Sequence, residues 1–247
     1  MSTYGEVALV HSMSYLADAQ AAIAHNLANV DTSNFKRRTS VAERSPDKFA
    51  DLLQSKLPMV QYHEYTVFEP GVTRETGSRF NVAIDGPYFL RLQGADGRTY
   101  LTRDGEMQLD DKGRLVNHAG LRYLDQNGAE ITLQGENGTP SDVAISPSGQ
   151  ISDPLTGQTW GPIGVVKVPD PAALEPTGGG LYLDTKKQPL QPAPGAPLKQ
   201  GYLEGSNVDS LQELVRMIQV QRTFGATQHV LTSLGNMQRS VADNLLR

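Results

Sequence analysis

The side chains best suited to metal or thiol chemistry are scattered or absent in this chain. The spacing of its histidines is not that of a metal site, and all five lie far apart: His11, His25, His63, His118 and His229. The 247 residues include no cysteine, which excludes thiolate catalysis, disulfides and cysteine-ligated zinc. The sequence therefore predicts neither a metal ion nor a cofactor.

Carboxylates suggest two other kinds of chemistry. Asp104, Asp110 and Asp111 lie close together, but they lack the D-x-D-x-D-G order and the final glutamate of a calcium loop, which favours hairpin turns. Glu130 and Glu136 are of the residue type that glycosidases use, yet any chain of this length contains such pairs. Because no nucleophile or phosphate-binding motif accompanies them, we expect no catalytic residues and a protein that is not an enzyme.

The charge and hydropathy patterns argue against nucleic-acid and membrane partners. The net charge is −5 and the basic residues are dispersed, whereas nucleic-acid binding requires a concentrated basic face. The exception, Lys36-Arg37-Arg38, is interpreted as a solvated loop. No run approaches the roughly 18 apolar residues of a membrane span. The first residues, Met1–Glu6, lack the basic start and apolar stretch of a cleaved secretory signal.

Both ends of the chain have the apolar spacing of amphipathic helices. Steps of three and four residues predict a helix over 7–30, through Leu9, Met13, Leu16, Gln20, Ile23 and Leu27. A second helix is predicted over 208–246, capped by Asn207 or Asp209. Its apolar positions include Leu211, Leu214, Ile218, Phe224, Leu231 and Leu234. The two helices either pair within one molecule or also pack on neighbouring subunits to build a tube, and the pattern leaves both open.

The middle of the chain reads as β structure. Between residues 77 and 168, turn dipeptides such as Asp104-Gly105 and Asn127-Gly128 separate short strands. The expected strands are Arg79–Ile84, Tyr88–Gln93, Thr99–Arg103, Met107–Leu109, Leu115–Val116, Ile131–Leu133, Asp142–Ile145, Ile151–Ser152 and Val165–Pro169. Before them we expect a short helix at Asp47–Lys56 and an extended segment over Met59–Phe68, and after them a Pro/Gly-rich loop over 169–200. Asn34 is expected in the left-handed conformation that ends the first helix.

The predicted fold class is a mostly β central domain, hairpin-rich and sandwich- or barrel-like, with long N- and C-terminal α-helices pairing as a coiled-coil-like hairpin. The expected segments are 1–35 as the N-terminal helix, 36–76 as an extended connector, 77–200 as the β domain and 201–247 as the C-terminal helix.

Four stretches resemble the signatures of bacterial flagellar rod and hook proteins. They are His25–Lys36, Asn81–Phe89, Tyr100–Gly105 with Gly113–Val116, and Gln200–Asp209 with Gln221–Phe224. Asn34 departs from the family, which usually has glycine there. The signature residues carried over are Asn26, Leu27, Asn29, Phe35, Gly86, Asp104, Gly105, Ser206, Asn207 and Val208.

The resemblance implies a structural subunit of the flagellar basal-body rod that polymerises through its terminal helices and transmits torque. It implies other rod subunits and the flagellar type III export apparatus as partners, and a periplasmic location reached without signal cleavage. Residues 161–168 favour the proximal-rod type. The alternatives are a distal-rod or hook-type subunit or, in a different class, a β-domain binding module or hydrolase with an internal helical hairpin. The expected assembly interface is Leu9, Met13, Leu16, Ile23, Leu27, Asn29, Leu211, Leu214, Ile218, Phe224, Leu231 and Leu234.

Overall fold

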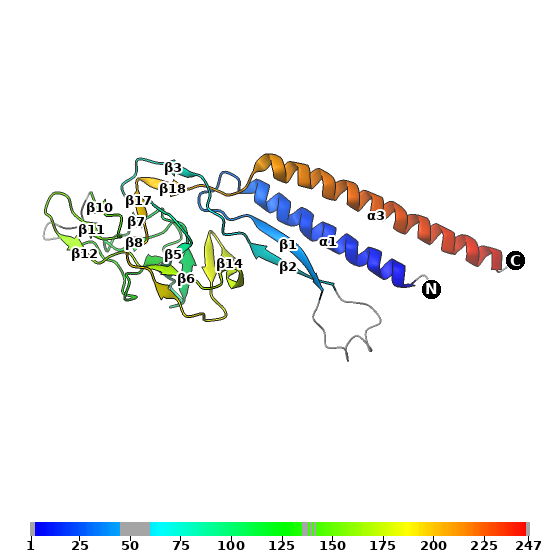
Figure 1. Ribbon diagram of the computed structural model, residues 1–247, viewed down its shortest axis with the longest axis horizontal. Coiled ribbons are helices and arrows are strands. Elements are labelled where there is room, and N and C mark those ends of the chain that lie inside the picture. The colour runs from blue at the N-terminus through cyan, green and yellow to red at the C-terminus, as the bar shows by residue number, and fades with distance from the viewer. Residues whose placement is uncertain (1–2, 45–59, 135–137, 139, 141, 246–247) are drawn as a thin grey trace. The chain divides into compact units, whose positions relative to one another are not determined.

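A computed structural model describes residues 3–44, 60–134, 138, 140 and 142–245 (Figure 1). The chain forms two compact units. Unit 1 contains Met1–Asn29, Arg38–Tyr65 and Asp209–Arg247, and unit 2 contains Val30–Arg37 and Thr66–Val208. The chain therefore passes between the units four times. The helix expected at Asp47–Lys56 lies outside the described residues, and the four-segment division stays a prediction.

The described residues of unit 1 form two long helices and a two-stranded sheet. Helices α1 (Thr3–Ala28) and α3 (Ser210–Leu245) lie side by side and run in opposite directions, and β1 (Arg38–Arg44) pairs with β2 (Val60–Thr66) (Figure 1). The side chain of Gln238, near the end of α3, donates a hydrogen bond to the Glu6 carboxylate near the start of α1. Neither of the two helices that the structure describes combines the length and the apolar character needed to cross a membrane.

Polar side chains define where these helices end and begin. At the end of α1, the Asn29 side-chain amide donates to the carbonyl oxygen of His25 at 2.8 Å. At the start of α3, the Asp209 carboxylate accepts hydrogen bonds from the backbone N–H groups of Leu211 at 3.0 Å and Gln212 at 3.1 Å. These bonds satisfy backbone groups that have no partner within the helix. The predicted Asp209 cap is confirmed.

Unit 2 is built from short strands. Among its described residues are a nine-stranded sheet, a three-stranded sheet and two strand pairs. The nine-stranded sheet has the order β14-β15-β6-β5-β9-β8-β7, with β13 pairing β5 and β16, while the others are β10-β11-β12, β17-β4 and β18-β3. The bounds are β3 Thr73–Glu75, β4 Val82–Ile84, β5 Tyr88–Gln93, β6 Thr99–Thr102, β7 Gln108–Leu109, β8 Leu115–Val116, β9 Arg122–Tyr123, β10 Ala144–Ile145, β11 Ile151–Ser152, β12 Thr159–Trp160, β13 Val165–Lys167, β14 Glu175–Gly178, β15 Leu181–Leu183, β16 Gln191–Pro192, β17 Leu198–Gln200 and β18 Tyr202–Glu204. A 3-10 turn at Pro171–Ala173 precedes β14.

Strand β5 lies between two apolar cores. Leu90 and Leu92 are fully buried in the larger core, whereas Phe89 belongs to a smaller one. Successive side chains of a strand point to opposite faces, so both faces of β5 are covered. In the smaller core, the rings of Phe68 and Tyr182 meet edge to face at 4.9 Å between centroids. The sheet around β5 is therefore the rigid part that positions the residues described below.

The mostly β middle and the two terminal helices are confirmed, and the strands at Tyr88–Gln93, Leu115–Val116 and Ile151–Ser152 have the expected bounds. The loop expected over 169–200 is wrong, because it contains β14, β15, β16 and β17. Two of these strands include a proline, Pro176 in β14 and Pro192 in β16, and both strands lie at sheet edges. Proline is tolerated there because an edge strand leaves some of its N–H groups unpaired.

Three further expectations differ from the structure. The segment Ile131–Leu133 makes a single bridge, between Thr132 and Arg114, rather than a strand. β1, β3, β9, β12 and β18 were not predicted. The hairpin turn expected at Asp104-Gly105 is wrong as well, because Gly105 does not have a positive φ. Gly105 instead lies where a Cβ atom would meet the Val82 carbonyl oxygen at 1.8 Å. Glycine is required at this position by close backbone approach and not by a positive φ.

Candidate functional site

A cluster of three buried charges, called the junction cluster, lies in unit 2. One carboxylate oxygen of Glu204 accepts hydrogen bonds from the Lys36 ammonium at 2.6 Å and the Gly71 backbone N–H at 2.8 Å. The other accepts from the Arg103 guanidinium at 2.7 Å. The side chains of Lys36, Arg103 and Glu204 are 0%, 2% and 4% exposed. Lys36 also donates to the Glu69 carbonyl oxygen at 2.9 Å. The interpretation of Lys36 as part of a solvated loop is therefore wrong.

The rest of the Arg103 guanidinium is also satisfied. Its terminal nitrogens donate to three backbone carbonyl oxygens between β4 and β5: Gly86 at 2.8 Å, Tyr88 at 2.8 Å and Ile84 at 3.1 Å. Gly86 adopts a φ of 95°, which a side chain would disfavour. A buried guanidinium is tolerated when its donors are paired, so Arg103 fixes this turn at the same time as it holds Glu204.

The cluster contains two cations and one anion, and its pKa shifts reflect that balance. Burial alone would raise the pKa of Glu204, but the charges and hydrogen bonds of Arg103 and Lys36 hold it below its ordinary value. Burial lowers the pKa of Lys36, with Arg103 adding to the effect and Glu204 opposing it. Glu204 therefore remains ionised, and its single negative charge is shared by two cations.

Asn34, which follows α1 in the sequence, is connected to the same cluster. Its φ of 60° confirms the expected left-handed conformation. Its backbone N–H donates to the Glu204 carbonyl oxygen at 2.8 Å, and its side-chain amide donates to the Asp104 carboxylate at 2.9 Å. Asp104 also accepts from the backbone N–H of Glu106 at 3.1 Å, and burial raises the pKa of Asp104. Asn34 thus joins residues far apart in the sequence.

Asn207 connects two other segments of unit 2, which contain Arg37 and Val67. Its side-chain oxygen accepts from the Arg37 backbone N–H at 2.7 Å, and its amide donates to the carbonyl oxygens of Val67 at 2.8 Å and Glu69 at 3.0 Å. Its own N–H donates to the Phe35 carbonyl oxygen at 3.4 Å. One amide side chain therefore joins three stretches of chain.

Every passage of the chain between the units is flanked by residues of this network. The passages follow Asn29, Arg37, Tyr65 and Val208. The network joins residues 34–37, 67–71 and 204–207, which are the stretches of unit 2 that precede or follow these passages. Next to the last passage, the Ser206 hydroxyl accepts from the N–H of Val208, which is 9% exposed.

Unit 1 has a polar network of its own, centred on Asn26 of α1. The Asn26 side chain donates to the Arg38 carbonyl oxygen at 2.8 Å and accepts from the Arg38 N–H at 2.9 Å. It also donates to the Glu213 carboxylate of α3 at 3.4 Å, and Glu213 pairs with Arg216 at 3.0 Å. Asn26 is 1% exposed and therefore connects α1, β1 and α3 from a buried position.

α1 and α3 each carry one row of residues at steps of three and four. Their members are partly or fully buried. On α1 they are Glu6, Leu9, Met13, Leu16, Gln20, Ile23 and Leu27, and on α3 they are Glu213, Met217, Val220, Phe224, Thr227, Leu231 and Leu234. This spacing is that of the inner positions of paired helices. We call these two rows the inner rows.

The structure divides the predicted assembly residues of α3 between two faces. Phe224, Leu231 and Leu234 lie in the inner row. Leu211, Leu214 and Ile218, together with Val215, form an exposed set at i, i+3, i+4 and i+7, which we call the outer patch. These four side chains are 70%, 49%, 50% and 47% exposed, respectively. The predicted residues of α1 are in its inner row, except Asn29, which caps the helix.

Sequence reasoning missed the charged residues of both networks. Lys36, Arg103 and Glu204 each lie inside a stretch that resembles the family signatures. The available signal was that these stretches contain charged residues of both signs. Glu213 showed no such signal, because an acidic residue in the first turn of a helix ordinarily faces solvent. In the described part of the chain, no group of histidine or carboxylate side chains is arranged to hold a metal ion.

Two family models match parts of this chain. A family model described as the flagellar basal body rod FlgEFG protein C-terminal matches residues 199–245, and one described as the flagellar hook protein FlgE/F/G D1 domain matches residues 83–153.

Among similar whole chains, the flagellar basal-body rod protein FlgF of Caulobacter vibrioides is 30% identical over 226 residues, with 90% of each chain covered. The flagellar basal-body rod protein FlgG of Buchnera aphidicola (subspecies Schizaphis graminum) is 32% identical, with 82% of this chain and 84% of the relative covered. The FlgG protein of Bacillus subtilis is 33% identical over 68% of this chain and 66% of its own.

Proposed function

We propose a mechanism of assembly from the premise that this chain belongs to the family of flagellar basal-body rod proteins. It is a structural subunit of the rod in the flagellar basal body and not an enzyme. We propose that α1 and α3 form the part that polymerises and that unit 2 forms an outer layer that transmits torque. The predicted interface residues supply the contacts, in two different ways.

The inner rows pair α1 with α3 of the same chain as a coiled-coil-like hairpin. Support comes from the three-and-four spacing on both helices and from the partial burial of both rows. Two of the predicted residues, Leu16 and Ile23, are 9% and 7% exposed, as this pairing requires.

The outer patch carries the contacts between subunits, and it is the single observation on which the proposal depends. Four large apolar side chains on one face of α3 are about half exposed or more. A contiguous apolar patch of this kind on a protein that assembles is a candidate protein–protein interface. Its neighbours are other rod subunits, either copies of this chain or different axial proteins.

A strain that lacks this chain provides the test. Leu214→Ser and Ile218→Ser should abolish swarming while leaving helix content and cellular protein level unchanged, because both side chains are half exposed in the free subunit. The matched controls Gln212→Ser and Gln219→Ser, at exposed polar positions of the same helix, should swarm normally. Normal swarming of both apolar variants would contradict the proposed role of the outer patch.

We further propose export through the flagellar type III pathway without signal cleavage, and assembly in the periplasm. The support is the resemblance of the first helix and its junction to the family. Intact mass measurement of the chain in purified basal bodies tests this, because removal of any N-terminal segment would contradict it.

For the position in the rod, we propose the proximal type, supported by the FlgF relative that matches 90% of each chain. The FlgG relatives support the distal type as the alternative. Expression of this chain in two strains, one lacking its FlgF-type gene and one lacking its FlgG-type gene, distinguishes them by which strain recovers motility.

A further inference from the structure

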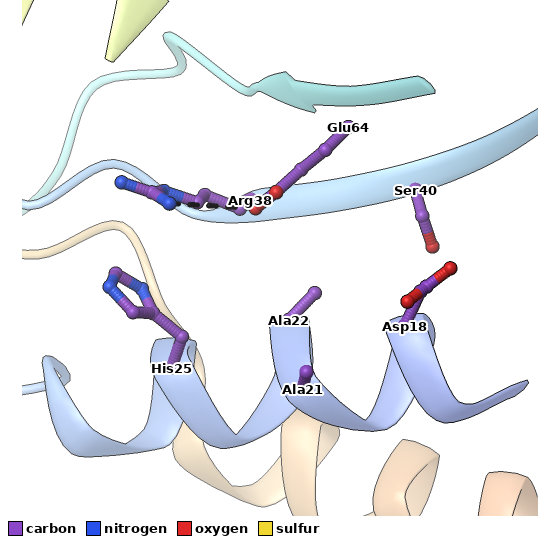
Figure 2. Close-up of a pocket in the computed structure, with 7 residues that line it drawn as sticks. All are labelled: Asp18, Ala21, Ala22, His25, Arg38, Ser40 and Glu64. Carbon is purple, nitrogen blue, oxygen red and sulfur yellow. Dashed lines mark ion pairs between the residues drawn. The ribbon is translucent and has the colours of Figure 1, made fainter. Parts of the chain in front are cut away.

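Unit 1 contains a hollow of about 380 Å³ between α1 and the β1–β2 pair. It is lined by Asp18, Ala21, Ala22 and His25 of α1, and by Arg38, Ser40 and Glu64 of the two strands (Figure 2). The alanines leave room because they carry no side chain beyond Cβ. A hollow of this kind suits one or two inserted side chains better than a whole helix.

The charges in the hollow leave one carboxylate without a partner. Arg38 and Glu64 pair at 3.7 Å. Within the described residues, the Asp18 carboxylate makes neither a hydrogen bond nor an ion pair. α1 contains no lysine or arginine, and its basic side chains are His11 and His25, of which His25 lines the hollow. The hollow is therefore suited to a cationic side chain from outside the chain.

Asp18 also points away from the partner helix of its own chain. It lies two residues after Leu16, an inner-row residue, and two residues correspond to about 200° of rotation around an α-helix. An occupant of the hollow consequently approaches α1 from the side opposite α3.

The outer face of α3 offers a cation of the required kind. Arg222 is exposed and follows Ile218 of the outer patch by four residues, about one helical turn. It lies two residues before the inner-row residue Phe224, so it points about 200° away from α1 of its own chain. Within the described residues, Arg222 makes no ion pair, whereas Arg216 is paired with Glu213.

We propose that the hollow of one subunit receives Arg222 from α3 of a second copy of this chain, with the guanidinium on Asp18 and the outer patch packed beside it. The two sides of this contact are different surfaces that face outward in opposite directions. Such a contact is heterologous and can repeat without closing, which is the requirement for a helical filament. The inference rests on the proposed function, since it names the partner of the outer patch.

A charge swap tests the pair in a strain that lacks the chain. Asp18→Arg and Arg222→Asp should each reduce the number of assembled basal bodies at least about tenfold, because each places two like charges together. The double variant, with both changes in every subunit, should restore most of the loss. Circular dichroism of each purified chain checks that its helices form. Two folded single variants that assemble normally, or a folded double variant that recovers nothing, would overturn the inference.

Disulfide trapping adds a measurement that does not depend on charge, since the chain has no cysteine. Cells would co-express one chain with Asp18→Cys and another with Arg222→Cys, so that a disulfide between these positions joins two copies. Oxidised basal bodies should yield a dimer about ten times more abundant than Asp18→Cys gives with the control Arg239→Cys on the same helix. Equal dimer from both pairs, or trapping of Asp18→Cys on a different protein, would contradict the pairing.

The two proposals fail in distinguishable ways. Loss of swarming in Ile218→Ser, together with no coupling between positions 18 and 222, would reject this pair and keep the outer patch as an interface. Normal swarming in Leu214→Ser and Ile218→Ser would reject the interface itself.

Discussion

Replacement of Glu204 by glutamine should destabilise unit 2 much more than replacement of its buried partner Lys36 by methionine would. The side chains of Lys36 and Arg103 are almost completely buried and share this one carboxylate at 2.6 and 2.7 Å. Glu204→Gln keeps the size of the side chain but leaves two buried cations without a counter-charge. Removing one partner of a buried ion pair costs about 3–5 kcal/mol, so we expect a loss in this range.

Lys36→Met is the matched comparison, and it should cost at most about 2 kcal/mol. This variant keeps the pair between Arg103 and Glu204 and removes the excess positive charge of the cluster. The cost that remains is the hydrogen bond from Lys36 to the Glu69 carbonyl oxygen and part of the packing of the side chain. We therefore expect Glu204→Gln to lower the free energy of unfolding by more than Lys36→Met does.

Urea unfolding followed by tryptophan fluorescence measures both variants. Trp160 is the only tryptophan of the chain and packs against the larger core of unit 2, so its emission reports on that unit. In thermal unfolding, a loss of 3–5 kcal/mol corresponds to a fall of roughly 6–20 °C for a protein of this size. The reasoning is refuted if Glu204→Gln loses less than about 1 kcal/mol, or if Lys36→Met loses as much as Glu204→Gln.

Three further outcomes follow from the structure. Because the pKa of Glu204 is lowered in the folded state, its stabilisation is fully present above its unfolded pKa of about 4.3 and is lost as the pH falls through the folded value. The difference in unfolding free energy between the wild type and Glu204→Gln should thus shrink below pH ~4.3, and a constant difference down to pH ~2 would be inconsistent with this. Gly105→Ala should lower the free energy of unfolding in urea by at least about 2 kcal/mol, because its Cβ would lie 1.8 Å from the Val82 carbonyl oxygen. The control is Gly97→Ala, because Gly97 has a positive φ but no atom lies within 4 Å of its added Cβ. Gly225→Ala should raise the stability of α3 by up to about 1 kcal/mol, since alanine favours a helix and the added methyl meets no atom within 4 Å. Circular dichroism during thermal unfolding measures this, and a lower melting temperature would show that α3 needs the flexibility of glycine.

The parts of the fold that could be predicted are those with a local signal. The three-and-four spacing of apolar residues identified both helices, although α1 begins at Thr3, earlier than expected. The left-handed conformation of Asn34 followed from the properties of its side chain. The strands of the 169–200 segment were missed because each has only two to four residues, too few for an alternating pattern to emerge.

The charged network could not be predicted because its contacts join distant residues. Lys36 and Glu204 are separated by 168 positions, and Arg103 and Glu204 by 101. A run of three basic residues ordinarily indicates a solvated surface, and nothing local shows that the first of them is buried. The split of the α3 residues between the inner row and the outer patch also required the structure, since hydrophobicity alone does not tell which face is covered within the chain.

The four passages of the chain between the units have a mechanical consequence. A subunit joined through one linker would let its two parts rotate about single bonds, so twisting force would dissipate in the linker. Here the load is divided among four polypeptide segments whose ends in unit 2 are held by one network around Glu204 and Asn207. No single segment therefore carries the whole connection. The connection depends on a few hydrogen bonds and ion pairs within unit 2.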